Sequence, residues 1–108
     1  MGCRAGITAG ISRHVIDSYY PDFQRWMIGL TNDIPALYRA WNRPAGFMCW
    51  RADSIGIARS VEHYFIRSKG MKGGLAAALD DRRPVSVCLF LSAAVSPLPT
   101  QTGSIAAA

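Results

Sequence analysis

The first clear pattern along the chain is a set of apolar residues that recurs every four positions. The set comprises Ile7, Ile11, Val15 and Tyr19. Side chains at this spacing share one face of a helix, so the pattern predicts a short amphipathic helix over residues 8–19. Thr8 is a suitable N-cap residue, and Pro21 ends the segment because its ring does not continue a helix.

A pattern with a period of two follows the predicted helix. Trp26, Ile28 and Leu30 fall on one face of residues 23–30. The aromatic and β-branched content of this segment suits a half-buried strand. We expect it to be the central strand of a sheet.

A short helix of about two turns is predicted next. Residues 31–33 supply side-chain oxygens that cap a helix, and Pro35 falls in the first turn, where its missing N–H costs little. The apolar residues at helical spacing are Ile34, Leu37, Tyr38 and Trp41. Residues 42–46 contain proline and glycine and are predicted to be a loop, and residues 47–51 are predicted to be a second strand.

The strongest helix signal in the chain runs from Ser54 to about Lys69. Asp53 and Ser54 are both good N-cap residues, and Gly70 stands where a left-handed C-cap residue is expected. One broad face of this helix is apolar and is formed by Ile55, Ile57, Ala58, Val61, Phe65 and Ile66. The pattern predicts a helix that packs this face against the sheet.

The last third of the chain contains one further strand, predicted over residues 85–91 because its apolar residues alternate. Before it we expect a flexible loop at 70–74, a short helical turn at 75–79 and a charged connector at 80–84. Residues 92–108 carry no charge and offer little to bury, so a largely disordered tail is expected. The prediction is a single α/β (α+β) domain over residues 1–91, with a small three-stranded sheet flanked by helices.

Composition indicates the kind of partner and the cellular compartment to expect. Twelve Lys and Arg residues against seven Asp and Glu residues give a formal charge of +5, which favours anionic partners such as nucleic acid. Cys3, Cys49 and Cys88 are odd in number and far apart, and they indicate neither a disulfide framework nor a zinc knuckle. We therefore expect a reducing compartment. No apolar run is long enough to span a bilayer, so a cytoplasmic protein without a membrane partner is predicted.

Glu62 is the one acidic residue that falls within the apolar face of the long helix, between Ala58 and Phe65. Burying an ionised carboxylate without a partner costs several kcal/mol. Such a residue is therefore paired, metal-bound, catalytic or placed at the edge of a cleft. The simpler alternative is a residue at the rim of the apolar face or a structural partner of an arginine.

The residues around this helix also resemble a known family. The run Trp26–Asp33 is similar to the second signature of GIY-YIG nucleases: an aromatic residue, two residues leading to glycine, and then Thr-Asn-Asp entering a helix. Ala58 and Glu62 resemble the helix on which that family carries its metal-binding glutamate. The resemblance covers residues 26–70. It implies a GIY-YIG-like fold and hydrolysis of DNA phosphodiesters, with one Mg²⁺ or Mn²⁺ ion held by Glu62.

The match to the family pattern is partial, and this shapes the candidate catalytic set. Trp26 stands where the family has a tyrosine, and Leu37 stands where it has an arginine. Tyr20 is a nearby tyrosine, and Arg39 lies two residues after Leu37. The resemblance thus implies Glu62, Tyr20 and Arg39 as catalytic residues. The alternative is a catalytically inactive interaction or nucleic-acid-binding module.

A polar stripe on the same helix is the second candidate site. Arg59, His63 and Arg67 recur every four residues, and Lys69 and Lys72 extend the stripe. These residues are suited to bind phosphates, with help from the glycine amides of the following loop. A solvated helix face is the alternative, because exposed helix faces are normally charged.

Overall fold

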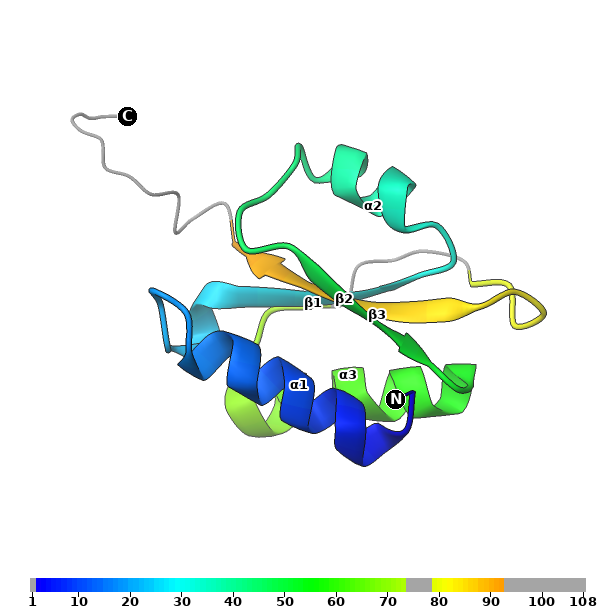
Figure 1. The fold of residues 1–108 in the computed structure, drawn as a ribbon, viewed down its shortest axis with the longest axis horizontal. Helices are drawn as coiled ribbons and strands as arrows, with labels where there is room; N and C mark the ends of the chain where they lie inside the picture. The colour runs from blue at the N-terminus through cyan, green and yellow to red at the C-terminus, as the bar shows by residue number, and fades with distance from the viewer. Residues whose placement is uncertain (1, 74–78, 93–108) are drawn as a thin grey trace.

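A computed structural model describes residues 2–73 and 79–92 of the chain. Within these residues the protein has an α+β fold of three α-helices, one short 3-10 helix and a three-stranded antiparallel sheet (Figure 1). The elements in chain order are α1 (Arg4–Ile16), η1 (Phe23–Arg25), β1 (Trp26–Thr31), α2 (Ile34–Ala40), β2 (Met48–Ala52), α3 (Ile55–Lys69) and β3 (Val85–Leu91). The predicted α+β class and three-stranded sheet are confirmed.

The strand order in the sheet is β1-β3-β2, and β3 is antiparallel to both neighbours. The last strand in sequence is therefore the central one. The prediction that the segment containing Trp26 is central is wrong, because β1 lies at one edge. A period of two identifies which face of a strand is buried, and it carries no information on which strands lie beside it.

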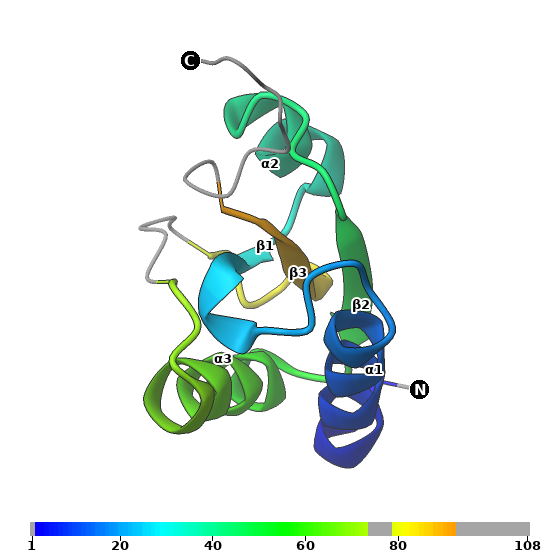
Figure 2. The ribbon, with the colours of Figure 1, turned by 90° about the vertical axis from the view of Figure 1, so that its left-hand side faces the viewer.

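The helices form two unequal layers on the sheet. Helices α1 and α3 cover one face, and the short helix α2 lies on the other side (Figures 1 and 2). The main core lies between the sheet and the α1–α3 layer. Its fully buried residues include Ile7, Ile11, Val15, Ile28, Ala58, Val61, Phe65, Val87 and Leu89.

The bounds of α1 and β1 differ from those predicted. Cys3 is the N-cap of α1 in place of Thr8, and its sulfur accepts from the backbone N–H of Gly6 at 3.4 Å. At the other end, the Ser18 hydroxyl donates to the carbonyl of Val15 at 2.6 Å, and the chain leaves the helix. Tyr19 is consequently outside the helix and 91% exposed. The segment before β1 forms η1, so that the strand begins at Trp26.

Helices α2 (Ile34–Ala40) and α3 (Ile55–Lys69) lie where the sequence predicts them, and their caps are among the predicted residues. The Ser54 hydroxyl accepts from the backbone N–H of Ile57 at 3.1 Å, and Gly70 ends α3 with a φ of 74°. The Asp33 carboxylate accepts from the backbone N–H of Ala36 at 3.1 Å at the start of α2. These side chains satisfy donors that the first helical turn leaves unpaired. Helix α2 buries none of its residues fully.

Cys49 and Cys88 are joined by a disulfide. They occupy directly paired positions of β2 and β3, with their Cα atoms 4.1 Å apart. The expectation drawn from the cysteine spacing is therefore wrong for this pair, because strand register brings together residues that are 39 positions apart in sequence. Cys3 is exposed and free.

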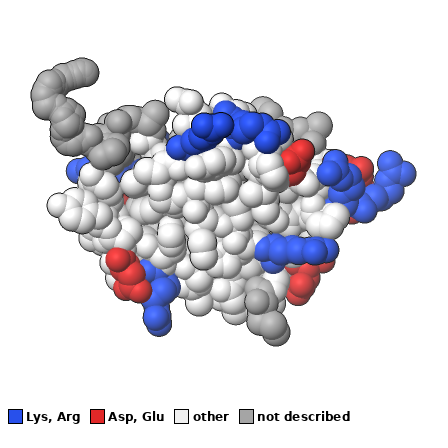
Figure 3. Space-filling model, turned by 45° about the horizontal axis from the view of Figure 1, so that its top comes forward, with Lys and Arg blue, Asp and Glu red and all other residues white. Residues whose placement is uncertain are grey.

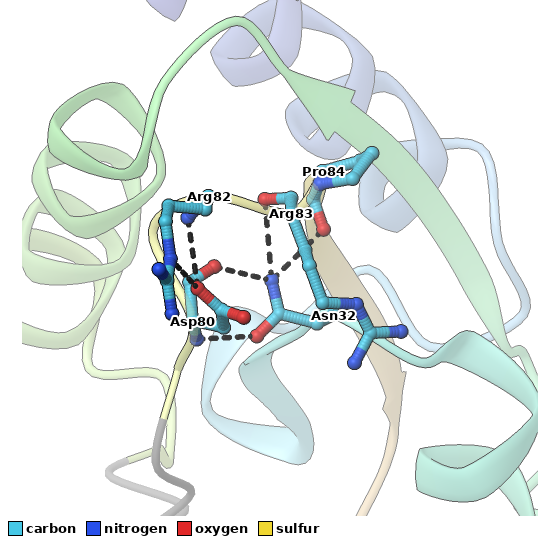
Figure 4. Close-up of polar contacts among 5 residues, drawn as sticks. All are labelled: Asn32, Asp80, Arg82, Arg83 and Pro84. Carbon is cyan, nitrogen blue, oxygen red and sulfur yellow. Dashed lines mark hydrogen bonds and ion pairs between the residues drawn. The ribbon is translucent and has the colours of Figure 1, made fainter.

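The connector between α3 and β3 is held by Asn32, which follows β1. Its side-chain nitrogen donates to the carbonyls of Asp80 at 3.0 Å, Pro84 at 2.9 Å and Arg83 at 3.4 Å (Figure 4). Its side-chain oxygen accepts from the backbone N–H of Asp80 at 2.7 Å. This one amide fixes the turn from which the central strand starts. The helical turn predicted over 75–79 and the tail predicted over 92–108 lie, except for Leu79 and Ser92, outside the described residues.

Candidate nucleic-acid interface

Glu62 lies at the edge of the apolar face of α3 and is half-buried. Burial raises the pKa of its carboxyl above the ordinary value of 4.5, and the charge of Arg59 partly opposes this rise. Within residues 2–73 and 79–92 its carboxylate has neither a hydrogen bond nor an ion pair. The carboxylate is therefore partly desolvated and is free to accept a cationic or hydrogen-bonding partner.

A divalent metal at Glu62 would have few protein ligands. No three His, Cys, Asp or Glu side chains among the described residues are grouped so that they could hold a metal ion. Mg²⁺ keeps several of its waters and is often held by one or two carboxylates together with the phosphates of a substrate. A single half-buried carboxylate without a protein partner fits such an ion, whereas it does not fit zinc, which takes three or four protein ligands.

The structure does not bring the three candidate catalytic residues into one place. Arg39 is exposed on α2, on the opposite side of the sheet from the α3 helix that carries Glu62 (Figure 1). Tyr20 precedes η1, and its carbonyl accepts from the indole N–H of Trp26 at 2.9 Å. Trp26 itself is 1% exposed. The residue at the family's tyrosine position is thus a core residue in this chain.

The predicted polar stripe is exposed along α3. Arg59, His63 and Arg67 are exposed, and so are Lys69, the last residue of α3, and Lys72, which follows the helix. None of these five residues forms an ion pair within the described part of the chain. The stripe therefore presents its positive charge to external partners.

Lys72 is fixed in position by the edge of the sheet. Its carbonyl accepts from the backbone N–H of Ile28 at 2.9 Å, and its own N–H donates to the carbonyl of Trp26 at 3.1 Å. The segment after α3 thereby runs parallel to β1. These bonds use only the backbone of Lys72, and its side chain is exposed. The basic series therefore continues from the helix to the edge of the sheet.

A cluster of aromatic and basic residues stands at the end of the molecule where this series finishes. The guanidinium of Arg25 lies 5.6 Å from the centre of the Tyr20 ring, and the Lys69 ammonium lies 5.5 Å from the centre of the Phe23 ring. The Tyr19 ring meets that of Tyr20 at 5.4 Å. Figure 2 looks onto this end, where η1 lies above the last turn of α3. The helical pattern assigned Tyr19 to a buried helix face, so this cluster was missed.

Other charged groups are distributed differently. Figure 3 shows basic side chains over the α2 side of the molecule, where Arg39 and Arg43 are exposed, and several other basic groups beside acidic ones. Arg82 pairs with Asp80 at 3.5 Å, for example. Arg39 thus belongs to a separate basic group from the α3 stripe.

In the described part of the chain, two clefts that border α1 are not lined by Glu62. One, of about 360 Å³, lies between α1 and β2 and is lined by Gly10, Arg13, His14, Asp17, Ser18, Met48 and Trp50. The other, of about 520 Å³, lies between α1 and the α3 residue Tyr64. Neither cleft combines the basic stripe with Glu62.

Comparison of the chain with protein-family models, with curated proteins and with solved structures finds no match. No helix in the described residues is long and apolar enough to cross a membrane. The case for a function therefore depends on the exposed residues of this chain.

Proposed function

We propose that this protein binds nucleic acid through the exposed basic face of α3 and the segment that follows it. The observation that carries the proposal is the series Arg59, Arg67, Lys69 and Lys72, whose charges are exposed and have no ion-pair partner among the described residues. Phosphate binding releases condensed counterions from nucleic acid, so unpaired cations of this kind contribute directly to affinity.

The arrangement of the series suits a linear polyanion. Arg59 and Arg67 are eight residues apart on one helix face, which corresponds to about 12 Å along the axis. Lys69 and Lys72 extend the same series to the edge of β1. Arg59 and Arg67 thus offer two cationic contacts along the helix, and Lys69 and Lys72 add two more at its C-terminal end, so that a phosphate backbone can be contacted at several points.

Salt dependence of binding tests the proposal. Fluorescence anisotropy of a labelled 20-nucleotide DNA is measured at several salt concentrations for the native protein, Arg59→Gln and Arg67→Gln. Each variant is expected to flatten the slope of log K against log salt by about one unit. Arg82→Gln is the matched control, because Arg82 is equally cationic but is paired with Asp80 away from the stripe. Absence of binding at low salt, or equal slopes for all variants, contradicts the proposal.

A second candidate function is metal-dependent cleavage of the bound nucleic acid. The half-buried carboxylate of Glu62, which has no described partner, favours it, as does the resemblance of residues 26–70 to GIY-YIG nucleases. Glu62 is the residue that we propose to hold Mg²⁺ or Mn²⁺, and the ion would stabilise charge on the phosphate. Arg39 lies across the sheet, so Arg59, one turn before Glu62, is the arginine better placed to assist.

Metal titration separates this second function from binding alone. We expect Mg²⁺ or Mn²⁺ to raise the melting temperature of the native protein and to leave that of Glu62→Gln unchanged. Nicking of supercoiled plasmid by the native protein should likewise be lost in Glu62→Gln. Equal responses of the two proteins to the metal would exclude Glu62 as its ligand.

A further inference from the structure

We infer that the cluster at the end of α3 stacks unpaired bases on Tyr19, so that the preferred ligand is single-stranded nucleic acid; this inference rests on the proposed nucleic-acid binding. Tyr19 is 91% exposed, the highest exposure among the large apolar residues that the structure describes. Its recorded ring contact is a T-shaped packing with Tyr20, with the ring centres 5.4 Å apart and an interplanar angle of 81°. With 91% of the residue exposed, at least one face of the Tyr19 ring is available to a flat partner.

The loop that carries Tyr19 is anchored on both sides. The Ser18 hydroxyl donates to the carbonyl of Val15 at 2.6 Å and accepts from the backbone N–H of Tyr20 at 3.0 Å. The Tyr20 carbonyl is in turn held by the buried indole of Trp26 at 2.9 Å. These bonds fix the backbone on either side of Tyr19. Because this backbone is already ordered, stacking of a base on the Tyr19 ring does not have to order the loop as well.

Cations for the phosphates contact the aromatic residues that follow Tyr19 in the chain. Arg25 lies over Tyr20, while Lys69 lies over Phe23, in the 3-10 helix that links the tyrosines to β1. The side chain of Gln24 lies against Gly70, which joins η1 to the end of α3. Asp22 pairs with Arg25 at 3.7 Å and offsets part of its charge, so Lys69 and Lys72 are the main phosphate contacts here. The end of α3 is thus in contact with the 3-10 helix that follows the tyrosines.

The geometry favours a single strand over a duplex. Bases in a duplex are stacked on each other, so their faces are closed to a protein side chain, whereas an unpaired base exposes its face. Stacking on an aromatic ring also tolerates any base, since each has a π-face. A backbone that follows the cations of α3 would deliver successive bases to Tyr19 without requiring a particular sequence.

The test compares a labelled 15-nucleotide oligo-dT with a 15-base-pair duplex by fluorescence anisotropy. Tyr19→Ala is expected to weaken oligo-dT binding about tenfold and to leave duplex binding unchanged. Tyr19→Phe should retain native affinity, because stacking needs the ring and not the hydroxyl. Ile16→Ala removes another exposed apolar side chain, 59% exposed, and serves as the matched control. Because Tyr19 makes little contact with the rest of the fold, its variants should melt like the native protein.

The outcomes distinguish the two proposals. If the native protein binds both ligands and Tyr19→Ala changes neither affinity, base stacking is overturned and phosphate binding by α3 stands. If Tyr19→Ala weakens duplex and oligo-dT binding equally, Tyr19 does not select unpaired bases, and the inference is likewise overturned. If the native protein binds neither ligand at low salt, the proposed function itself fails.

Discussion

Cys49 on the edge strand β2 and Cys88 on the central strand β3 are directly paired on neighbouring strands and are joined by a disulfide. Cys88 is fully buried and Cys49 is half-buried. The bond links residues 39 positions apart and so ties the middle of the chain to its last strand. A domain of this size buries a limited core, so one cross-link is a substantial part of its stability.

Loss of this disulfide should destabilise the protein markedly. The chain-entropy model gives about 4 kcal/mol for a closed loop of this length. Cys49→Ala is therefore expected to lower the midpoint of urea unfolding, and reductant should bring the native protein to a similar midpoint. Cys3→Ser is the control, because Cys3 is free and a serine hydroxyl also caps a helix. Alkylation of all three cysteines in the unfolded, unreduced protein would contradict the prediction.

The disulfide also bears on the cellular setting. The predicted reducing interior stays a prediction. Disulfides persist in oxidising environments and are rare in the cytosol, so the Cys49–Cys88 pair is an observation against it. The cysteine spacing did not indicate this pair because the sequence does not show which strands are neighbours or in what register they pair.

A second prediction concerns the amide of Asn32, which binds the turn before β3 through four hydrogen bonds. Asn32→Ala should lower the free energy of unfolding by about 1–3 kcal/mol, since it leaves several backbone groups of this turn without partners. Asn32→Asp keeps the acceptor for the Asp80 N–H but sets a carboxylate against three carbonyl oxygens, so it should be at least as destabilising at neutral pH. Urea unfolding of both variants, with Asp33→Asn as a neighbouring control, checks this. A native midpoint for Asn32→Ala would show that the turn does not depend on the amide.

Much of the fold was predictable because local rules and tertiary packing agree. In α3 the caps Ser54 and Gly70 and the apolar face all indicate the same helix, and the structure has it. The order of the strands was not predictable. The apolar pattern of residues 85–91 indicates a buried strand, but it does not indicate which strands lie beside it. Tyr19 was misplaced because the four-residue period continued by chance beyond Val15, where the Ser18 hydroxyl ends the helix.

The candidate site was predictable only in part. The exposed stripe on α3 follows from helical periodicity, and Glu62 follows from its angle on the same helix. Sequence distance placed Arg39 close to the strand that carries the family-like run, but α2 lies across the sheet from α3. The contact of η1 with the end of α3 joins residues that are far apart in sequence. No local sequence pattern therefore predicted the cluster of Tyr20, Arg25 and Lys69.

Two helical glycines provide a third prediction, because the same substitution should have opposite effects at them. Alanine is favoured over glycine inside a helix by about 1 kcal/mol. At Gly56 a Cβ meets nothing closer than the Ser54 hydroxyl at 3.8 Å, so Gly56→Ala should stabilise the protein by up to about that amount. At Gly10 a Cβ approaches Trp50 Nε1 closer than van der Waals contact allows, so Gly10→Ala should destabilise it by about 1–3 kcal/mol. Thermal melting of the two variants checks the prediction, which fails if both shift the midpoint in the same direction.

The raised pKa of Glu62 gives a pH dependence with a definite sign. Between the ordinary value of 4.5 and the raised value, the folded protein binds a proton more tightly than the unfolded chain does. The stability of the native protein should therefore fall relative to that of Glu62→Gln as the pH rises through this window. Below pH 4.5 the difference in free energy of unfolding between the two proteins should become constant. At neutral pH the stability of Glu62→Gln relative to the native protein should be greatest.

Arg59→Gln sharpens this test because it removes the charge that lowers the pKa of Glu62. The pH window over which stability falls should then widen toward higher pH. At neutral pH, the difference in free energy of unfolding between Arg59→Gln and the double variant Arg59→Gln/Glu62→Gln should exceed the difference between the native protein and Glu62→Gln. Urea unfolding from pH 4 to pH 8 measures all four proteins, and every other titrating group cancels in the two comparisons. If the native protein and Glu62→Gln have parallel profiles throughout, the carboxylate is fully solvated, and the case for a desolvated ligand at this position of α3 is lost with it.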